Sequence, residues 1–431
     1  MKRIVWLLLS YWRTRRLRFA DRAQLAAYQQ RQLARFIDTL CARSAYFAPF
    51  RALPLAQWPS MNKALMLEHF DTINTAGIEL APAMEAAMVA ERSRDFTPAV
   101  GDITVGLSSG TSSQRAVFAV SPREKAQWAG VMLARALPDG LFSGEKVALF
   151  LRANSNLYTA VRSPWLTFAF YDLFQPFESL CAELVAYRPS VIVAPAQVLR
   201  QLALGVIEGR LLLAPKKVIS VAEVLEAQDR ALIVQAFGAV HEIYQATEGF
   251  LASSCEHGVL HLNEEYVHIE PQWLDEQQRR FVPVITDFTR ITQPIVRYRL
   301  DDILLARATP CPCGRVTRAI DGIEERCDDM LLLPSLREGQ TVAVFADVLM
   351  RAFAQALPAD GDYRLVQLGE ATLQLHAAQN AAGLAALRLH LEGVLAGLGV
   401  AVERLDWILD GDLPPFDPTM KRRRIRRLSS I

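Results

Sequence analysis

The run SVIVAP at residues 190–195 decides the fold, because it belongs to a series of short apolar runs separated by helical patterns. The other runs of the series are, in chain order, KVALFLR (146–152), LTFAFYDLF (166–174), KKVISV (216–221) and VHEIYQ (240–245). Helical patterns lie between them, one through Leu184 and another from Ala222 to Phe237. Short strands that alternate with helices are typical of βαβ units, so this part of the chain predicts a parallel sheet.

On the N-terminal side of this region the chain is mostly helical. Residues 21–72 repeat apolar side chains at three- and four-residue steps, and polar, proline-marked turns follow them. The uncharged run from Ile4 to Trp12 is far shorter than the roughly 20 residues that span a bilayer. We therefore expect a first helix of a soluble protein and no membrane span, with a membrane-surface anchor as the alternative.

On the C-terminal side the pattern changes twice. After Tyr244 it consists of strand pairs and loops, and beyond about Arg326 a shorter unit reads helix, strand, strand, helix, strand. The predicted fold class is therefore α/β. A large N-terminal domain (residues 1–325) would hold the parallel sheet and an additional β subdomain, and a small C-terminal α+β domain (residues 326–431) would follow.

Composition and charge narrow the class of protein and its partners. The 431 residues are 51% hydrophobic and 22% charged, which is ample for a buried core. The 47 basic and 46 acidic residues almost cancel, so charge gives no reason to expect nucleic acid as a partner. Six cysteines in so long a chain make no disulfide framework, which favours the cytoplasm.

A polar turn, LSSGTSSQRAVF at residues 107–118, is a candidate phosphate site. Small hydroxyl residues around a glycine let backbone N–H groups and side-chain O–H groups point to one place, which suits a phosphate. The turn lacks the second glycine and the lysine of the common phosphate-binding loop. An ordinary surface loop is the alternative interpretation.

Four motifs accompany this turn, namely YQATEG (244–249), ITDFTRITQPIVRYRLDDIL (285–304), ERCDDML (325–331) and PTMKRRR (418–424). In this order and approximate spacing, they resemble the adenylate-forming superfamily and, within it, the phenylacetate-CoA ligase branch. The chain looks most similar to adenylate-forming enzymes related to the synthetase that adenylates a deazaflavin coenzyme.

The resemblance implies a set of roles, residue by residue. Thr247 and Glu248 would meet the phosphate and Mg²⁺, Lys421 would reach the reacting carboxylate, and Arg326 would lie at a hinge into a mobile small domain together with Asp328 and Asp329. The residues implied to bind ATP are Ser108, Ser109, Gly110, Thr111, Ser112, Tyr244, Asp302 and Arg326 itself. Cationic groups at these places would compensate the repulsion between a carboxylate and a triphosphate.

Three positions depart from the family pattern. Ser113 stands where a glycine is usual, and Met420 precedes the last lysine in place of a glycine. Asp301 and Asp302 are adjacent, so the ribose ligand is ambiguous by one residue. Arg115 could supply the cation that family loops often carry.

The implied reaction is ATP-dependent adenylation of a carboxylic acid, followed by transfer to a thiol of CoA or of an acyl carrier protein. One alternative leaves AMP on a phenolic hydroxyl as a stable product, and another is a catalytically impaired nucleotide-binding scaffold. Aromatic residues of SPWLTFAFYDLF are candidate walls for an aryl acid, and these are Trp165, Phe168, Phe170 and Tyr171. They could equally be core residues of a buried strand.

A structural zinc site is also predicted, with free buried thiols, which are ordinary in a cytoplasmic protein, as the alternative interpretation. Cys255 and His261 lie near one another in CEHGVLH, and Cys311 with Cys313 follows in CPCG, which some members of the resembled branch use for zinc. Two thiolates from one turn and a Cys/His pair from another complete a tetrahedral Zn²⁺ site. His261 is preferred to His257, which precedes Gly258 in a turn.

The basic segment KRRRIRR, Lys421 to Arg427, is expected to be a solvated end of the chain. Its residues Arg422 to Arg424 would then steer a phosphate-rich acceptor such as CoA.

Overall fold

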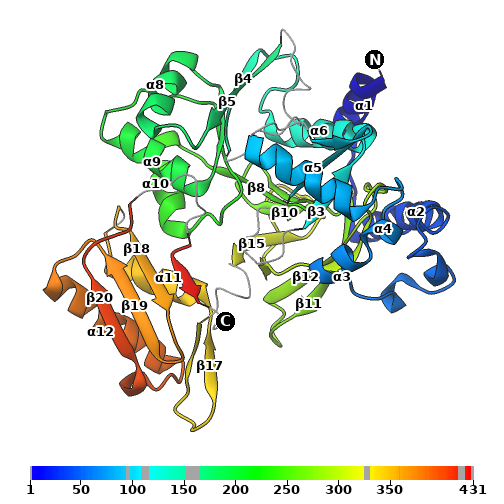
Figure 1. The fold of residues 1–431 in the computed structure, drawn as a ribbon. Helices are drawn as coiled ribbons and strands as arrows, with labels where there is room; N and C mark the ends of the chain where they lie inside the picture. Colours follow the sequence, from blue (N-terminus) through cyan, green and yellow to red (C-terminus); the bar gives the residue numbers. More distant parts are fainter. Residues whose placement is uncertain are drawn as a thin grey trace.

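The computed structural model describes residues 2–93, 98–107, 116–151, 165–324, 331–358, 360–415 and 423–428. Its centre is a 12-stranded sheet whose strand order is β11-β12-β14-β15-β10-β9-β8-β7-β6-β4-β5, with β13 paired to β12 (Figure 1). Strands β5, β4, β6, β7 and β8 run parallel, whereas β8 pairs with β9 antiparallel. The predicted parallel sheet and additional β region are therefore both present, as two halves of one sheet.

The parallel strands correspond to the short apolar runs of the sequence. Strand β6 is buried along its whole length, as expected for a central strand covered on both faces. The strands and helices of this half are β4 (Glu145–Leu151), β5 (Leu166–Asp172), α8 (Phe177–Tyr187), β6 (Val191–Ala194), α9 (Ala196–Ile207), β7 (Lys217–Ser220), α10 (Ala227–Phe237) and β8 (His241–Ala246).

The antiparallel half consists of strands joined by turns and loops, which brings residues far apart in sequence to one edge. These strands are β9 (Gly249–Ser254), β10 (Leu260–Leu262), β11 (Val267–Trp273), β12 (Arg280–Asp287), β13 (Ile295–Arg299), β14 (Ile303–Ala306) and β15 (Ala319–Glu324).

Two long N-terminal helices pack against this core, and the first of them lies on α6 (Pro122–Ala136). The close approach depends on Gly130 of α6, since a Cβ there would lie 2.3 Å from the carbonyl oxygen of Leu7 in α1 (Lys2–Arg16). Helix α6 begins with a capping box between Ser121 and Glu124. The predicted first helix is thus a packed element of the fold.

Part of the N-terminal prediction was wrong. The helical pattern of residues 21–72 forms α2 (Arg22–Cys41) and then only short pieces, since Phe47 and Trp58 pack into the core from non-helical turns. The short pieces are η1 (Ala48–Phe50), η2 (Leu55–Gln57), α3 (Lys63–Glu68) and α4 (Phe70–Ile73).

The described residues between 80 and 120, where only turns were predicted, form a small unit of one helix and three strands. Helix α5 (Leu80–Ser93) packs on a three-stranded sheet, and its small residues Ala83 and Ala87 face the sheet. The strands are β1 (Ala99–Val100), β2 (Ile103–Leu107) and β3 (Val117–Val120).

The C-terminal unit, residues 331–428, has a hydrophobic core of its own that runs from Leu331 to Ile425. Its four-stranded sheet has the order β20-β19-β18-β21, with two helices packed on it (Figure 1). Its elements are β16 (Leu331–Pro334), β17 (Thr341–Val344), α11 (Ala346–Ala356), β18 (Tyr363–Gln367), β19 (Thr372–Ala377), α12 (Ala381–Gly397), η4 (Val402–Arg404), β20 (Asp406–Asp410) and β21 (Ile425–Arg427). The predicted order of helix, strand, strand, helix and strand is present, with β16, β17 and β21 added.

No helix in the described part of the chain is long and apolar enough to cross a membrane.

Lys217, the first residue of β7, is a charged residue whose burial is expected to lower the stability of the protein. Its ammonium donates to the carbonyl oxygen of Arg135, 3.1 Å away, and burial together with nearby Arg315 lowers the pKa of Lys217 to about 8. The pKa of Lys217 in the folded protein lies below the unfolded value of about 10.4. Burial of the charged ammonium therefore lowers the free energy of unfolding fully below pH 8, and this loss of stability disappears as the pH rises to about 10.5.

We expect Lys217→Met to raise the melting temperature at pH 7 by about 3 °C and to lose this gain near pH 10.5. Thermal unfolding at the two pH values measures the effect, with exposed Lys2→Met as the control. An equal gain at both pH values would point to better packing rather than to a relieved charge.

Candidate active site

The turn between β8 and β9 carries Thr247 and Glu248 at the edge where β8 ends. The Arg290 guanidinium, from the turn after β12, donates to the carbonyl oxygen of Thr247 at 2.6 Å and holds this turn in place. Gly249 completes the turn, and a Cβ at this position would lie 3.3 Å from a carboxylate oxygen of Asp287. The polar groups of two hairpins therefore meet at one point.

Tyr244 and Asp302 lie together beside this turn. The Tyr244 hydroxyl donates to the Asp302 carboxylate, 2.5 Å away. Asp301 is exposed, whereas Asp302 is only partly so. Of the two adjacent aspartates, Asp302 is thus the one in contact with a residue of the predicted nucleotide site.

Glu248 is held in an environment that opposes its charge. Burial raises its pKa, and nearby Asp302 adds to the rise, while the Tyr298 hydroxyl and Arg290 oppose it. Carboxylate oxygen is a ligand that Mg²⁺ prefers, and a cation beside Glu248 would compensate the charge that burial opposes. The residues present therefore fit Mg²⁺.

The predicted phosphate turn can be located only by its two ends. Ser108, Ser109, Gly110, Thr111 and Ser112 lie outside the described residues, as do Arg326 and Lys421. The described ends are close to the site, because Leu107 and Phe118 line one cavity with Thr247, and Val117 lines another with Glu248.

A cleft of about 720 Å³ opens beside Thr247, and the described residues that line it include six basic side chains and two acidic ones. Both acidic groups in it are already engaged: Glu124 accepts from the backbone N–H groups of Ile291 and Thr292 at 2.6 and 2.8 Å, and Asp287 accepts from Thr289. The basic residues, from α1, α2 and the turn after it, α6, and the turn after β12, are Arg13, Arg35, Arg43, Arg123, Lys125 and Arg290. The cleft is therefore suited to a polyanion.

An apolar cavity of about 190 Å³ lies between α6 and the parallel strands. Leu151, Val193 and Val221, at or next to the carboxyl ends of three strands, line it, as does Ala222, whose φ of +66° is rare for a residue with a side chain. The cavity and the basic cleft share Trp128 and Gln245. A single ligand with an apolar group in the cavity and an anionic group in the basic cleft would therefore fit both.

Only one of the four predicted aromatic walls lies in this cavity. Phe168 lines it, whereas Trp165 is 54% exposed and Tyr171 stacks on Phe150 on the opposite face of the sheet. Phe170 does not line it either. The core interpretation thus holds for Tyr171, because alternate residues of a strand face opposite sides.

Cys255, His261, Cys311 and Cys313 form one cluster whose four ligand atoms all lie within 4.8 Å of one another. The Sγ atoms of Cys255 and Cys311 are 3.6 Å apart, and Sγ of Cys313 lies 3.3 Å from Nε2 of His261. The neighbouring His257 is exposed and lies outside this cluster.

The cluster is built from two turns on adjacent strand pairs. Cys255 follows β9 and His261 lies in β10, while the other two cysteines lie between β14 and β15. Nδ1 of His261 faces the carbonyl oxygen of Thr317 at 3.2 Å, which leaves Nε2 directed at the thiols. Ligand atoms of a tetrahedral zinc–thiolate site lie about 3.8 Å apart, given a Zn–S bond of about 2.3 Å, so the donor set fits zinc.

Two residues of the site were not singled out from the sequence. Arg290 and Tyr298 both lie in the segment ITDFTRITQPIVRYRLDDIL, but their contacts with the turn of Thr247 and Glu248 depend on the pairing of β12 with β13. Only the register of that pair brings them to this turn.

No protein-family model and no curated protein sequence matches the chain. Solved structures do match. The chain is similar to a 2-hydroxyisobutyryl-CoA ligase in its postadenylation state in complex with 2-HIB-AMP, with a TM-score of 0.66, 18% identity, and coverage of 98% of this chain and 92% of that one.

The same ligase in its thioesterification state, with 2-HIB-AMP and CoA, gives a TM-score of 0.52 at 18% identity, covering 93% of this chain and 89% of that one. The amide bond synthetase McbA from Marinactinospora thermotolerans gives 0.53 at 13% identity, covering 74% and 68%. At these identities the likeness establishes the fold.

Proposed function

Because the chain has the fold of adenylate-forming ligases, we propose that it uses ATP to convert a carboxylic acid into an acyl-AMP, and then transfers the acyl group to a thiol. The observation that carries the proposal is the convergence of Tyr244, Thr247, Glu248 and Asp302 beside a basic cleft and an apolar cavity. This edge of a parallel sheet, outside the carboxyl ends of its strands, is where such folds bind ligands.

In this proposal Asp302 binds the ribose hydroxyls, and Tyr244 orients it through their hydrogen bond. Thr247, Arg290 and the residues Ser108–Ser112 bind the phosphates. Glu248 would hold Mg²⁺, which supplies positive charge to the phosphate oxygens during the displacement. Lys421 would act on the charge that develops between the carboxylate and the α-phosphate.

The acid is proposed to place its apolar part in the cavity between α6 and β4, β6 and β8. The cavity is lined by Trp128, Phe168 and aliphatic side chains, and its volume of about 190 Å³ suits an aryl or a branched aliphatic monocarboxylic acid. Among the described residues that line it, Gln245 contributes an amide, and this residue also lines the basic cleft.

We further propose that residues 1–325 and 326–431 are two domains, and that the second rotates about Arg326 between adenylation and thiol transfer. The arrangement of the two parts resembles the postadenylation state of the 2-hydroxyisobutyryl-CoA ligase more than its thioesterification state, with TM-scores of 0.66 and 0.52. This likeness supports an arrangement used for adenylation. The acceptor thiol is CoA or the phosphopantetheine arm of a carrier protein.

The cluster of Cys255, His261, Cys311 and Cys313 is proposed to hold a structural zinc ion. All four positions of a tetrahedral ion are filled by protein atoms, so no position remains for a substrate. The ion would tie the turn after β9 to the turn after β14.

The test is release of pyrophosphate from ATP with a panel of aryl and aliphatic acids, followed by product analysis with CoA and with a carrier protein. AMP and a thioester are the expected products. A stable AMP adduct of a phenolic hydroxyl would show the alternative adenylation, and no pyrophosphate with any acid would leave a nucleotide-binding scaffold.

We expect Glu248→Gln to lower Mg²⁺-dependent turnover by about 100-fold, because it removes the carboxylate that would bind the ion. Initial rates over a range of Mg²⁺ concentrations measure the effect, and circular dichroism checks that the variant is folded. Exposed Glu276→Gln is the matched control. A Glu248→Gln enzyme as active as the parent would place the metal elsewhere.

A further inference from the structure

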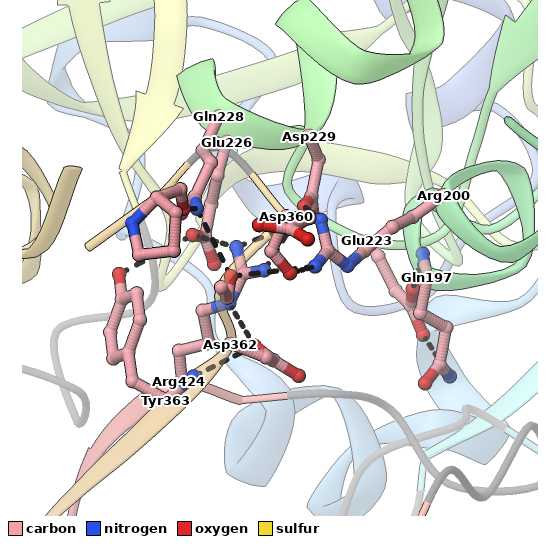
Figure 2. Close-up of polar contacts among 12 residues, drawn as sticks. Gln197, Arg200, Glu223, Glu226, Gln228, Asp229, Asp360, Asp362, Tyr363 and Arg424 are labelled. Carbon is pink, nitrogen blue, oxygen red and sulfur yellow. Dashed lines mark hydrogen bonds and ion pairs between the residues drawn. The ribbon is translucent and has the colours of Figure 1, made fainter. Parts of the chain in front are cut away.

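The C-terminal unit meets α9 and α10 of the large sheet through a cluster of buried charges (Figure 2). Its central residue is Arg424, which lies next to the start of β21 and is only 1% exposed. For Arg424 this corrects the prediction of a solvated basic end, since Arg424 is buried among carboxylates and is not available to steer an acceptor, whereas Arg426 is exposed as predicted.

Arg424 bridges the two parts of the chain. Its Nε atom donates to Asp362 of its own unit at 2.8 Å. Its Nη2 and Nη1 atoms donate to Asp229 of α10 at 3.0 and 3.3 Å, and Nη1 also donates to Glu226 at the start of that helix. One guanidinium therefore contacts both surfaces at once.

A second layer of contacts fixes the backbone of the C-terminal unit. Arg200 of α9 donates to Asp229 at 3.3 Å and to the carbonyl oxygen of Asp360. Gln228 donates through Nε2 to the carbonyl oxygens of Pro358 and Gly361, at 2.9 and 3.0 Å. Figure 2 shows these side chains converging on the segment next to Tyr363.

The charges of this cluster depend on each other. Burial opposes the charge of Arg424, but the carboxylates of Glu226, Asp229 and Asp362 outweigh it and raise its pKa well above the ordinary value. Asp229 is fully buried, so removal of Arg424 would leave it short of compensating charge. Separation of the two surfaces would instead let water reach every one of these groups.

This difference makes the contact suitable for repeated opening. An apolar interface would expose hydrophobic surface each time it opened, whereas these polar groups exchange protein partners for water at small net cost. The buried geometry also makes the closed contact specific, because a misplaced charge would be left unpaired.

We propose that the Arg424 cluster, defined as Arg424, Asp362, Glu226, Asp229 and Arg200, is a latch that holds the C-terminal unit in the arrangement used for adenylation and must open before thiol transfer. This inference rests on the proposed function, and it names positioning residues that lie outside the nucleotide and acid sites.

The first test compares the two half-reactions in Arg424→Met and Asp229→Asn. We expect pyrophosphate release to fall about tenfold in each, and thiol transfer from supplied acyl-AMP to be unchanged or faster. The double variant should be no worse than the single ones, because both remove the same contact. Arg426→Met, which changes an exposed residue of β21 two positions from Arg424, is the control. Equal losses in both half-reactions would overturn the latch.

The first readout of the second test is crosslinking, which does not depend on activity. Gln228→Cys and Asp360→Cys are introduced together, and their reaction with a short bismaleimide is compared with the background from the native cysteines. We expect efficient crosslinking, reduced severalfold by Arg424→Met and by Asp229→Asn but not by Arg426→Met. The crosslinked enzyme should release pyrophosphate and fail to form thioester.

Crosslinking that is equally efficient with and without Arg424→Met or Asp229→Asn would overturn the proposal. Arg424 would then stabilise only its own unit, through its hydrogen bond to Asp362. A crosslinked enzyme that completes both half-reactions would overturn it as well. If crosslinking depends on Arg424 and no acid yields pyrophosphate, the contact is upheld and the proposed function is rejected.

Discussion

Lys421→Ala should lower acid-dependent pyrophosphate release by about 100- to 1000-fold while leaving ATP binding almost unchanged. The lysine is proposed to act on charge that develops only in the transition state, so its loss affects the rate of the chemical step more than the affinity for ATP. Single-turnover kinetics measures the first quantity, and calorimetric titration with ATP measures the second.

Exposed Arg426→Ala provides the control, since it removes a nearby positive charge from the same basic segment. If Lys421→Ala released pyrophosphate at a rate close to that of the parent, another cation would have to be sought, and Arg290 would be the first candidate because it contacts the turn of Thr247.

The second large effect is expected at the cysteine cluster. The purified protein should contain about one zinc ion per chain, and Cys311→Ser should lose the metal and melt about 10 °C or more lower, because binding of a structural ion contributes directly to folding. Elemental analysis and thermal unfolding measure the two quantities.

Cys181→Ser is the matched control, since Cys181 is also buried but lies in a different core. It should keep the zinc. A parent protein with far less than one zinc per chain, together with an equally stable Cys311→Ser variant, would leave the four residues as ordinary free thiols.

The parallel half of the sheet could be predicted because each of its strands is a short apolar run bounded by turns. Strand β6 and the run SVIVAP differ by one residue at each end. Helix α5 was missed because its alanine-rich sequence has no strong apolar stripe. The helix is stabilised instead by packing on the three-stranded sheet, which the sequence pattern does not reveal.

The sequence also predicted which cysteines and which histidine meet, since strand alternation fixes the direction of His261. It could not tell which aromatic residues line a cavity. The alternation of β5 separates Phe168 from Tyr171, but which face of the strand borders empty space depends on where α6 packs.

The burial of Arg424 could not be predicted at all. Its partners Glu226 and Asp229 lie almost 200 residues earlier in the chain, on a helix of another layer. A run of arginines in sequence is usually solvated, and only the approach of two separately packed units turns one of them into an interior residue.

The close packing of α1 on α6 has a consequence for substrate choice. One face of α6 carries Trp128 and Met132 into the apolar cavity, while Gly130 on another face lies against the backbone of α1. The first helix of the chain therefore supports this wall of the proposed acid pocket from behind. We expect repacking of Leu7 or Tyr11, neither of which lines the cavity, to alter acid preference, and removal of α1 to loosen the same wall.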